Sequence, residues 1–128
     1  MGIVEQKIAV TTTGSAGSAT GDNTSTLVTH GFLLGFRLDY HASAPATTDV
    51  TITAELPSGY PAFTLLTVSN NNTDIAYRPI QAATYDTSNT ATGLYTLIPI
   101  QGHTIKATVA QADALAPCVT VYVVYMKE

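Results

Sequence analysis

The segment that most constrains the fold is residues 32–41, which read FLLGFRLDYH. Alternate side chains of an extended chain point to opposite faces, so one face carries Phe32, Leu34, Phe36, Leu38 and Tyr40. A helix would scatter these residues around its axis, because its repeat is about 3.6 residues. Leu33 is the only large apolar residue on the other face. The pattern predicts a strand with Phe36 near the centre of its core face.

Shorter, threonine-rich segments repeat this alternation. They predict strands near residues 3–10, 27–41, 49–55, 63–69, 75–80, 94–100, 103–109 and 118–125. Gly, Pro, Asn and Asp gather in most of the connections, as turns require. Gln101-Gly102 separates two strand-like runs and predicts a tight hairpin. We therefore expect an all-β chain, a single jelly-roll-like β-sandwich of about eight strands.

Residues 11–26 contain Gly, Ser and Thr but no large apolar side chain. Such a stretch cannot offset its ordering entropy by burial, which predicts a flexible leash. The chain then divides into an N-terminal strand with its linker (1–26) and a β-sandwich domain (27–128). We expect this strand to contact a neighbouring subunit or a larger surface, through Ile3, Val4, Ile8 and Val10. The alternatives are a mobile surface loop and a strand that completes its own sheet.

Only 11% of the residues are charged, and threonine, with 22 residues, takes their place. A surface this poor in charge is a weak solubiliser, which favours cover by a partner. The net charge of −4 and the five scattered basic residues argue against nucleic-acid binding. We expect neither a targeting segment nor a membrane span. Cys118 has no second cysteine with which to pair and is interpreted as a small buried hydrophobe.

Catalytic and metal-binding patterns are weak in this sequence. Asp39 and His41 share a strand face, but a zinc site needs at least three protein ligands, and His30 and His103 lie far away in the sequence. No Gly-x-Ser-x-Gly elbow, phosphate loop or carboxylate pair is present. We expect a protein that is not an enzyme and that uses no metal or cofactor.

Carbohydrate binding is a separate possibility, because many small β-sandwiches bind sugars on aromatic platforms. The sequence contains no tryptophan. Four tyrosines in or near the predicted loops could supply stacking surfaces: Tyr60, Tyr77, Tyr85 and Tyr95. Rim positions with a buried ring and a wet hydroxyl are the more common use of such residues.

Several strand-and-turn blocks carry a family resemblance, namely residues 39–52, 66–74, 106–112 and 119–123. These blocks resemble the head decoration (cement) proteins of tailed bacteriophages. The resemblance implies a β-sandwich that binds the major capsid protein on the outside of the phage head, commonly as a homotrimer, and so a place in the virion. Two alternatives stay open: a carbohydrate- or receptor-binding domain of a phage fibre or bacterial surface protein, and a head–tail connector protein.

Overall fold

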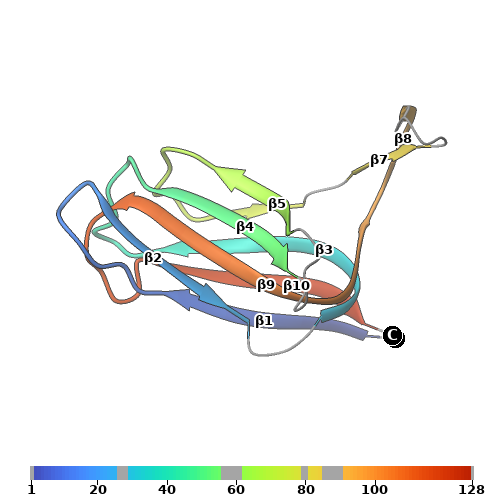
Figure 1. The fold of residues 1–128 in the computed structure, drawn as a ribbon, viewed down its shortest axis with the longest axis horizontal. Helices are drawn as coiled ribbons and strands as arrows, with labels where there is room; N and C mark the ends of the chain where they lie inside the picture. The colour runs from blue at the N-terminus through green and yellow to red at the C-terminus, as the bar shows by residue number, and fades with distance from the viewer. Residues whose placement is uncertain (1, 26–28, 56–61, 79–80, 85–90, 128) are drawn as a thin grey trace.

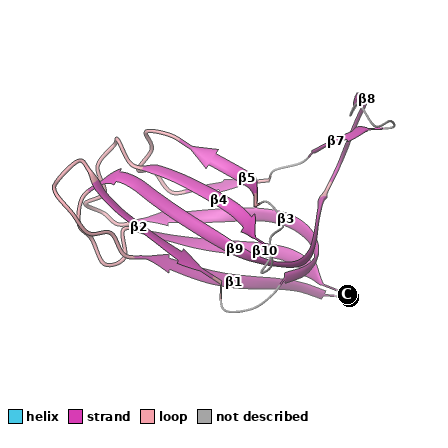
Figure 2. Cartoon of the chain, in the orientation of Figure 1, coloured by secondary structure: helices cyan, strands magenta, loops and turns pink. Residues whose placement is uncertain are grey.

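The computed structural model describes residues 2–25, 29–55, 62–78, 81–84 and 91–127. Its elements run from β1 to β10, and the described residues contain strands and no helix (Figures 1 and 2). No helix long and apolar enough to cross a membrane occurs in these ranges. The strands form two antiparallel sheets packed as a sandwich, which confirms the all-β sandwich expected from the sequence.

The first sheet begins at β1 (Gly2–Val10), which pairs with β10 (Val119–Lys127) along its whole length. β10 pairs in turn with β3 (Thr29–Tyr40). Two segments share the far edge of β3: the first residues of β9 (Ile98–Ala112) and the short β6 (Ile75–Tyr77). The second sheet contains β2 (Ala19–Thr24), the rest of β9, β4 (Asp49–Glu55) and β5 (Phe63–Val68).

β9 is one strand of 15 residues that belongs to both sheets. His103 lies opposite Thr29 of the first sheet, whereas Thr104 lies opposite Glu55 of the second. Gly102, whose φ is 77°, is the extra residue of a β-bulge at this transition. The prediction of a hairpin at Gln101-Gly102 is therefore wrong, because the glycine bends a continuous strand and does not reverse it.

The core lies between the two sheets and consists of aliphatic side chains with few aromatics. Its largest fully buried members include Phe36, Ile52, Ile105, Val109 and Val121. Thr51 and Thr53 of β4 alternate with buried residues along the strand. Their side chains therefore face outward, and those of Val50, Ile52 and Ala54 lie in the core. The chain thus uses β-branched residues on both faces, which suits the pleated backbone.

The core face predicted for residues 32–40 is wrong at its N-terminal end, because β3 contains a β-bulge. Val124 pairs with Gly35 and Tyr125 with Leu33, so Leu34 is the extra residue between them. The bulge reverses the alternation, and Leu33 is fully buried while Phe32 is 43% exposed. Phe36, Leu38 and Tyr40 are buried as predicted.

The N-terminal strand lies within its own sandwich. The side chains of Ile8 and Val10 are almost completely buried in the core. The predicted separate arm and the division at residue 26 are therefore wrong: β1 supplies the edge strand of the first sheet, and β2 lies inside the predicted linker. Burial of the apolar face of β1 explains why the strand joins its own sheet.

Hydrogen bonds hold the predicted leash in place. Thr12 N–H donates to the Leu115 carbonyl oxygen at 3.0 Å, and Gly17 N–H donates to Asp113 Oδ1 at 2.9 Å. Cys118 N–H donates to the Val10 carbonyl oxygen at 2.8 Å. The loop between β9 and β10 therefore adds partners to those within the leash itself, where Thr13 and Thr20 exchange backbone hydrogen bonds.

β7 (Gln81–Thr84) and β8 (Ala91–Thr96) pair as a separate two-stranded antiparallel ribbon. Figure 1 shows this ribbon projecting away from the sandwich, beyond β5.

Candidate functional site

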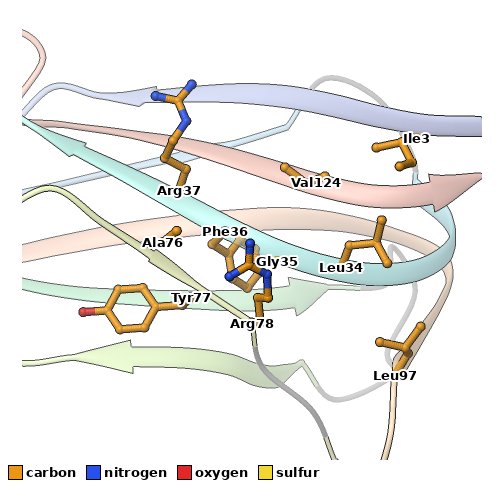
Figure 3. A pocket seen from close by; sticks show the side chains of 10 residues that line it. All are labelled: Ile3, Leu34, Gly35, Phe36, Arg37, Ala76, Tyr77, Arg78, Leu97 and Val124. Carbon is orange, nitrogen blue, oxygen red and sulfur yellow. The ribbon is translucent and has the colours of Figure 1, made fainter.

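A groove of about 610 Å³ opens on the outer face of the first sheet, where the chain leaves for the β7–β8 ribbon. Figure 3 shows its lining, which comes from β1, β3, β6, β10 and the residue between β8 and β9. The apolar part of the lining consists of Ile3, Leu34, Val124 and Leu97, and Phe36, Gly35 and Ala76 lie among them. The polar part consists of Arg37, Arg78 and Tyr77.

The apolar part of the groove is unusually accessible. Ile3 is 73% exposed and Leu97 is 36% exposed, and Phe32 lies on the same outer face. Cross-strand pairing aligns Ile3 with Met126 and Met126 with Phe32, so two exposed apolar side chains flank the half-buried Met126 in a row across three strands. Contiguous apolar surface of this kind marks interaction sites in soluble proteins.

The bulge at Leu34 creates much of this surface. It lies in the gap on the β3 edge, between the residues that pair with β9 and those that pair with β6. There Gly35 is approached by the backbone of β6, and a Cβ on Gly35 would lie 2.7 Å from the Tyr77 carbonyl oxygen. A larger residue at position 35 would push β6 away and change the shape of the groove.

Two guanidinium groups border the apolar surface. The Arg37 guanidinium stacks on the Tyr122 ring of β10, with 3.8 Å between Cζ and the ring centroid. Arg78 follows β6 and is exposed. The chain has only five basic residues, and two of them line this groove, while Asp39 and Asp74 line the adjoining hollow beside Arg37.

Three of the four predicted contact residues of the N-terminal strand lie in or against the core. Ile8 and Val10 lie in the core, and the prediction that they contact another subunit is wrong. Val4 is half-buried and packs against the same core. Ile3 is exposed in the groove, where a contact with another molecule stays a prediction.

Of the four tyrosines that could stack on a sugar, one lies in the groove. Tyr77 lines one side, but its ring packs partly against the core. Tyr60 and Tyr85 lie outside the described residues. Tyr95 pairs with Ala82 in the ribbon, and only its backbone is described.

The histidines lie at opposite ends of β3. His41 follows the strand, and its Nδ1 accepts the Ser43 backbone N–H at 3.0 Å. His30 and His103 lie on adjacent strands at the other end. Burial lowers the pKa of His103, with a smaller contribution from the charge of His30. Over the described residues, no group of three or more potential metal ligands comes together.

The sequence offered a partial signal for the groove. Phe32 and Leu34 stood out as large apolar residues, but strict alternation assigned them to the core face. Arg37 stood out on the opposite face. The groove depends on the bulge and on the return of the chain at β6, and neither follows from local alternation.

No family model matches the chain, and no curated protein matches it. Among solved structures, the chain is similar to two point variants of the family 29 carbohydrate-binding module CBM29-2, each at 13% identity and a TM-score of 0.41. These alignments cover 98% and 97% of this chain, and 81% of each module. A third structure, described as a carbohydrate binding module of family 29, has 12% identity and a TM-score of 0.40 over 97% of this chain and 77% of its own. Similarity at this level does not indicate a shared ligand.

Proposed function

We propose that this chain is a non-enzymatic structural protein that attaches to a larger protein assembly through the outer face of its first sheet. The supporting observation is the open groove, with Ile3, Leu34 and Val124 as exposed or half-buried apolar side chains. The family resemblance of the strand-and-turn blocks indicates which assembly this is: the major capsid protein on the outside of a phage head, so that the protein belongs to the virion. The resemblance also implies a homotrimer, which attachment through the groove does not require.

The groove suits a protein surface because it combines an apolar area with two arginine side chains. Burial of apolar area supplies most of the affinity of such contacts. Arginine is enriched in the energetically important part of protein interfaces, and the stacking of Arg37 on Tyr122 holds its guanidinium in place before binding.

The test uses empty shells of the major capsid protein from the genome that encodes this chain, which the gene neighbourhood identifies. The protein should sediment with these shells. Val124→Glu and Arg37→Glu should each weaken the binding by about tenfold or more, since a charge enters the apolar area or a border charge reverses. Thr67→Glu, on an exposed position of β5, is the matched control and should bind normally. Absence of binding to the shells, or equal binding by all variants, would refute the proposal.

A second candidate function is binding of a carbohydrate or a surface receptor. It is favoured by planar guanidinium donors beside an apolar surface in one groove, since sugars present both hydroxyls and apolar C–H faces. A glycan array separates the two candidates. Binding to a defined glycan that Arg37→Glu abolishes, without binding to shells, would favour the second.

A further inference from the structure

β1 is an edge strand of the first sheet, and no described strand pairs with its side opposite β10, although Asn23 of β2 contacts the Ala9 end of that side. The strand order of the first sheet begins at β1, which pairs only with β10 among the described strands. Its pairing runs over nine residues without a register shift, and its sequence contains no proline. Edge strands of this kind are templates for pairing with another chain unless something blocks them.

The direction of the backbone groups follows from one hydrogen bond. Asn23 Nδ2 donates to the Ala9 carbonyl oxygen at 2.9 Å from β2, so this carbonyl points away from β10. In a strand, backbone groups alternate in direction, so those of Ile3, Glu5 and Lys7 point the same way as those of Ala9. These three residues present their N–H and C=O groups on the side of β1 opposite β10.

The side chains along this edge are self-complementary. Glu5 and Lys7 are both exposed and lie on the outer face, on either side of Gln6, whose Nε2 donates to Tyr125 Oη at 2.9 Å inside the sandwich. If a second copy lies antiparallel with the two Gln6 residues opposite each other, Glu5 of each copy faces Lys7 of the other. Opposite charges at directly opposed positions stabilise an antiparallel pair.

Neighbouring registers are less favourable. Backbone direction allows shifts of the pairing only in steps that keep Glu5 and Lys7 in hydrogen-bonded positions. The next such register in one direction places Glu5 opposite Glu5, and in the other direction it places Lys7 opposite Lys7. A lysine on an edge strand normally discourages association. Here Lys7 has an opposite charge to face, Glu5 of the second copy, in one register only, so the two charges favour that register over its neighbours.

We propose that β1 pairs with β1 of a second copy of this chain, antiparallel and centred on Gln6, to form a two-fold dimer. The two-fold axis is perpendicular to the sheet, because opposed side chains in an antiparallel pair lie on the same face. Both outer faces, and with them both grooves, therefore point in the same direction. This two-fold dimer differs from the trimer that the family resemblance implies, and it does not depend on what the groove binds.

Charge exchange at positions 5 and 7 tests the pairing and its register together. The protein is prepared without an N-terminal tag, and its dissociation constant is measured by sedimentation equilibrium. Glu5→Lys and Lys7→Glu should each raise the dissociation constant by about tenfold, since each places like charges opposite each other twice per dimer. The double variant E5K/K7E restores opposite charges and should return the constant to near that of the parent.

Two controls keep the result specific. Asp39→Lys makes the same charge change on the outer face of β3, away from the β1 edge, and should leave the dimer intact. Thermal melts of all variants check that the sandwich is folded, as expected for exposed positions. Arg37→Glu should weaken groove binding without affecting the dimer, which separates this proposal from the proposed function.

A cysteine pair gives independent evidence for the register. Opposed residues of a hydrogen-bonded pair have Cα atoms about 5.5 Å apart, within the range of a disulfide. E5C/K7C should therefore oxidise to a covalent dimer, whereas E5C alone should not. A monomer at about 100 μM or more, a trimer in place of the dimer, or a double charge exchange that fails to restore association would overturn the proposal.

Discussion

The Thr12 hydroxyl accepts the backbone N–H of Leu115 at 3.1 Å, which joins two residues at opposite ends of the chain. The same hydroxyl donates to the Asp113 carbonyl oxygen at 2.5 Å. Thr12 is buried, so both bonds form away from bulk water.

Replacement of Thr12 by valine keeps the shape of the side chain and removes both hydrogen bonds. Because the backbone groups of Leu115 and Asp113 lose their partner, we expect the free energy of unfolding to fall by about 1–3 kcal/mol. Urea denaturation measures the change. Thr13→Val, at an exposed neighbouring position, is the control and should stay within about 0.5 kcal/mol of the parent.

The bulge in β3 predicts opposite outcomes for two phenylalanines. Phe36 is 2% exposed, and Phe36→Ala should cost about 3–5 kcal/mol and unfold much of the protein near body temperature. Phe32 is 43% exposed, and Phe32→Ala should cost about 1 kcal/mol or less. Equal losses in the two melts would contradict the reversal of the strand faces.

Gly31 occupies a backbone conformation that other residues rarely adopt, with a φ of 138°. A Cβ there would also collide with the Met126 carbonyl oxygen of β10. Gly31→Ala should therefore lower the free energy of unfolding by about 2 kcal/mol or more. Gly2→Ala meets no atom within 4 Å and should be neutral in the same denaturation experiment.

Removal of residues 1–12 tests the place of β1. The deletion takes Ile8 and Val10 out of the core and exposes the edge of β10. Each lost aliphatic side chain costs about 2–5 kcal/mol, a large part of the total stability of a typical domain. Circular dichroism should show a chain that no longer unfolds cooperatively, and an unchanged melt would mean that β1 is dispensable.

Burial raises the pKa of the Cys118 thiol, although a hydrogen bond with Thr12 acts in the opposite direction. The folded protein therefore keeps this proton at a pH where the unfolded chain has lost it. Stability should fall as the pH rises above about 8.5, the ordinary pKa of a cysteine thiol. Cys118→Ala should flatten this dependence in urea titrations between pH 8 and 9.5 or so. A slope equal to that of the parent would assign the effect to other groups.

The strands that local patterns identify best are those with a single buried face. β4 alternates regularly, and its bounds, Asp49–Glu55, agree with the predicted range. Prediction from local alternation failed where a single extra residue reverses the alternation of a strand or changes the strand with which it pairs. Leu34 and Gly102 each add a residue to a strand, and a bulge is specified by the neighbouring strands more than by the local sequence.

The predicted leash failed for a related reason. Residues 11–25 contain no apolar residue larger than alanine, yet Ala19 is completely buried and Thr12 nearly so. Their partners, Asp113 and Leu115, lie in a loop about a hundred residues later, so no local window contains both halves of the contact. The candidate groove could not be predicted for the same reason. Ile3, Arg37 and Val124 line one groove only because β1, β10 and β3 pair, and these strands lie far apart in the sequence.

The continuity of β9 has a mechanical consequence. In a sandwich whose sheets are joined only by loops, the sheets can shear past each other along the packed interface. Here a single backbone passes from one sheet to the other between His103 and Thr104 and is hydrogen-bonded in both. Relative sliding of the sheets would have to break the backbone hydrogen bonds of β9 with either β3 or β4. A load applied to the outer face of the first sheet is therefore transmitted along the backbone of β9 into the second sheet.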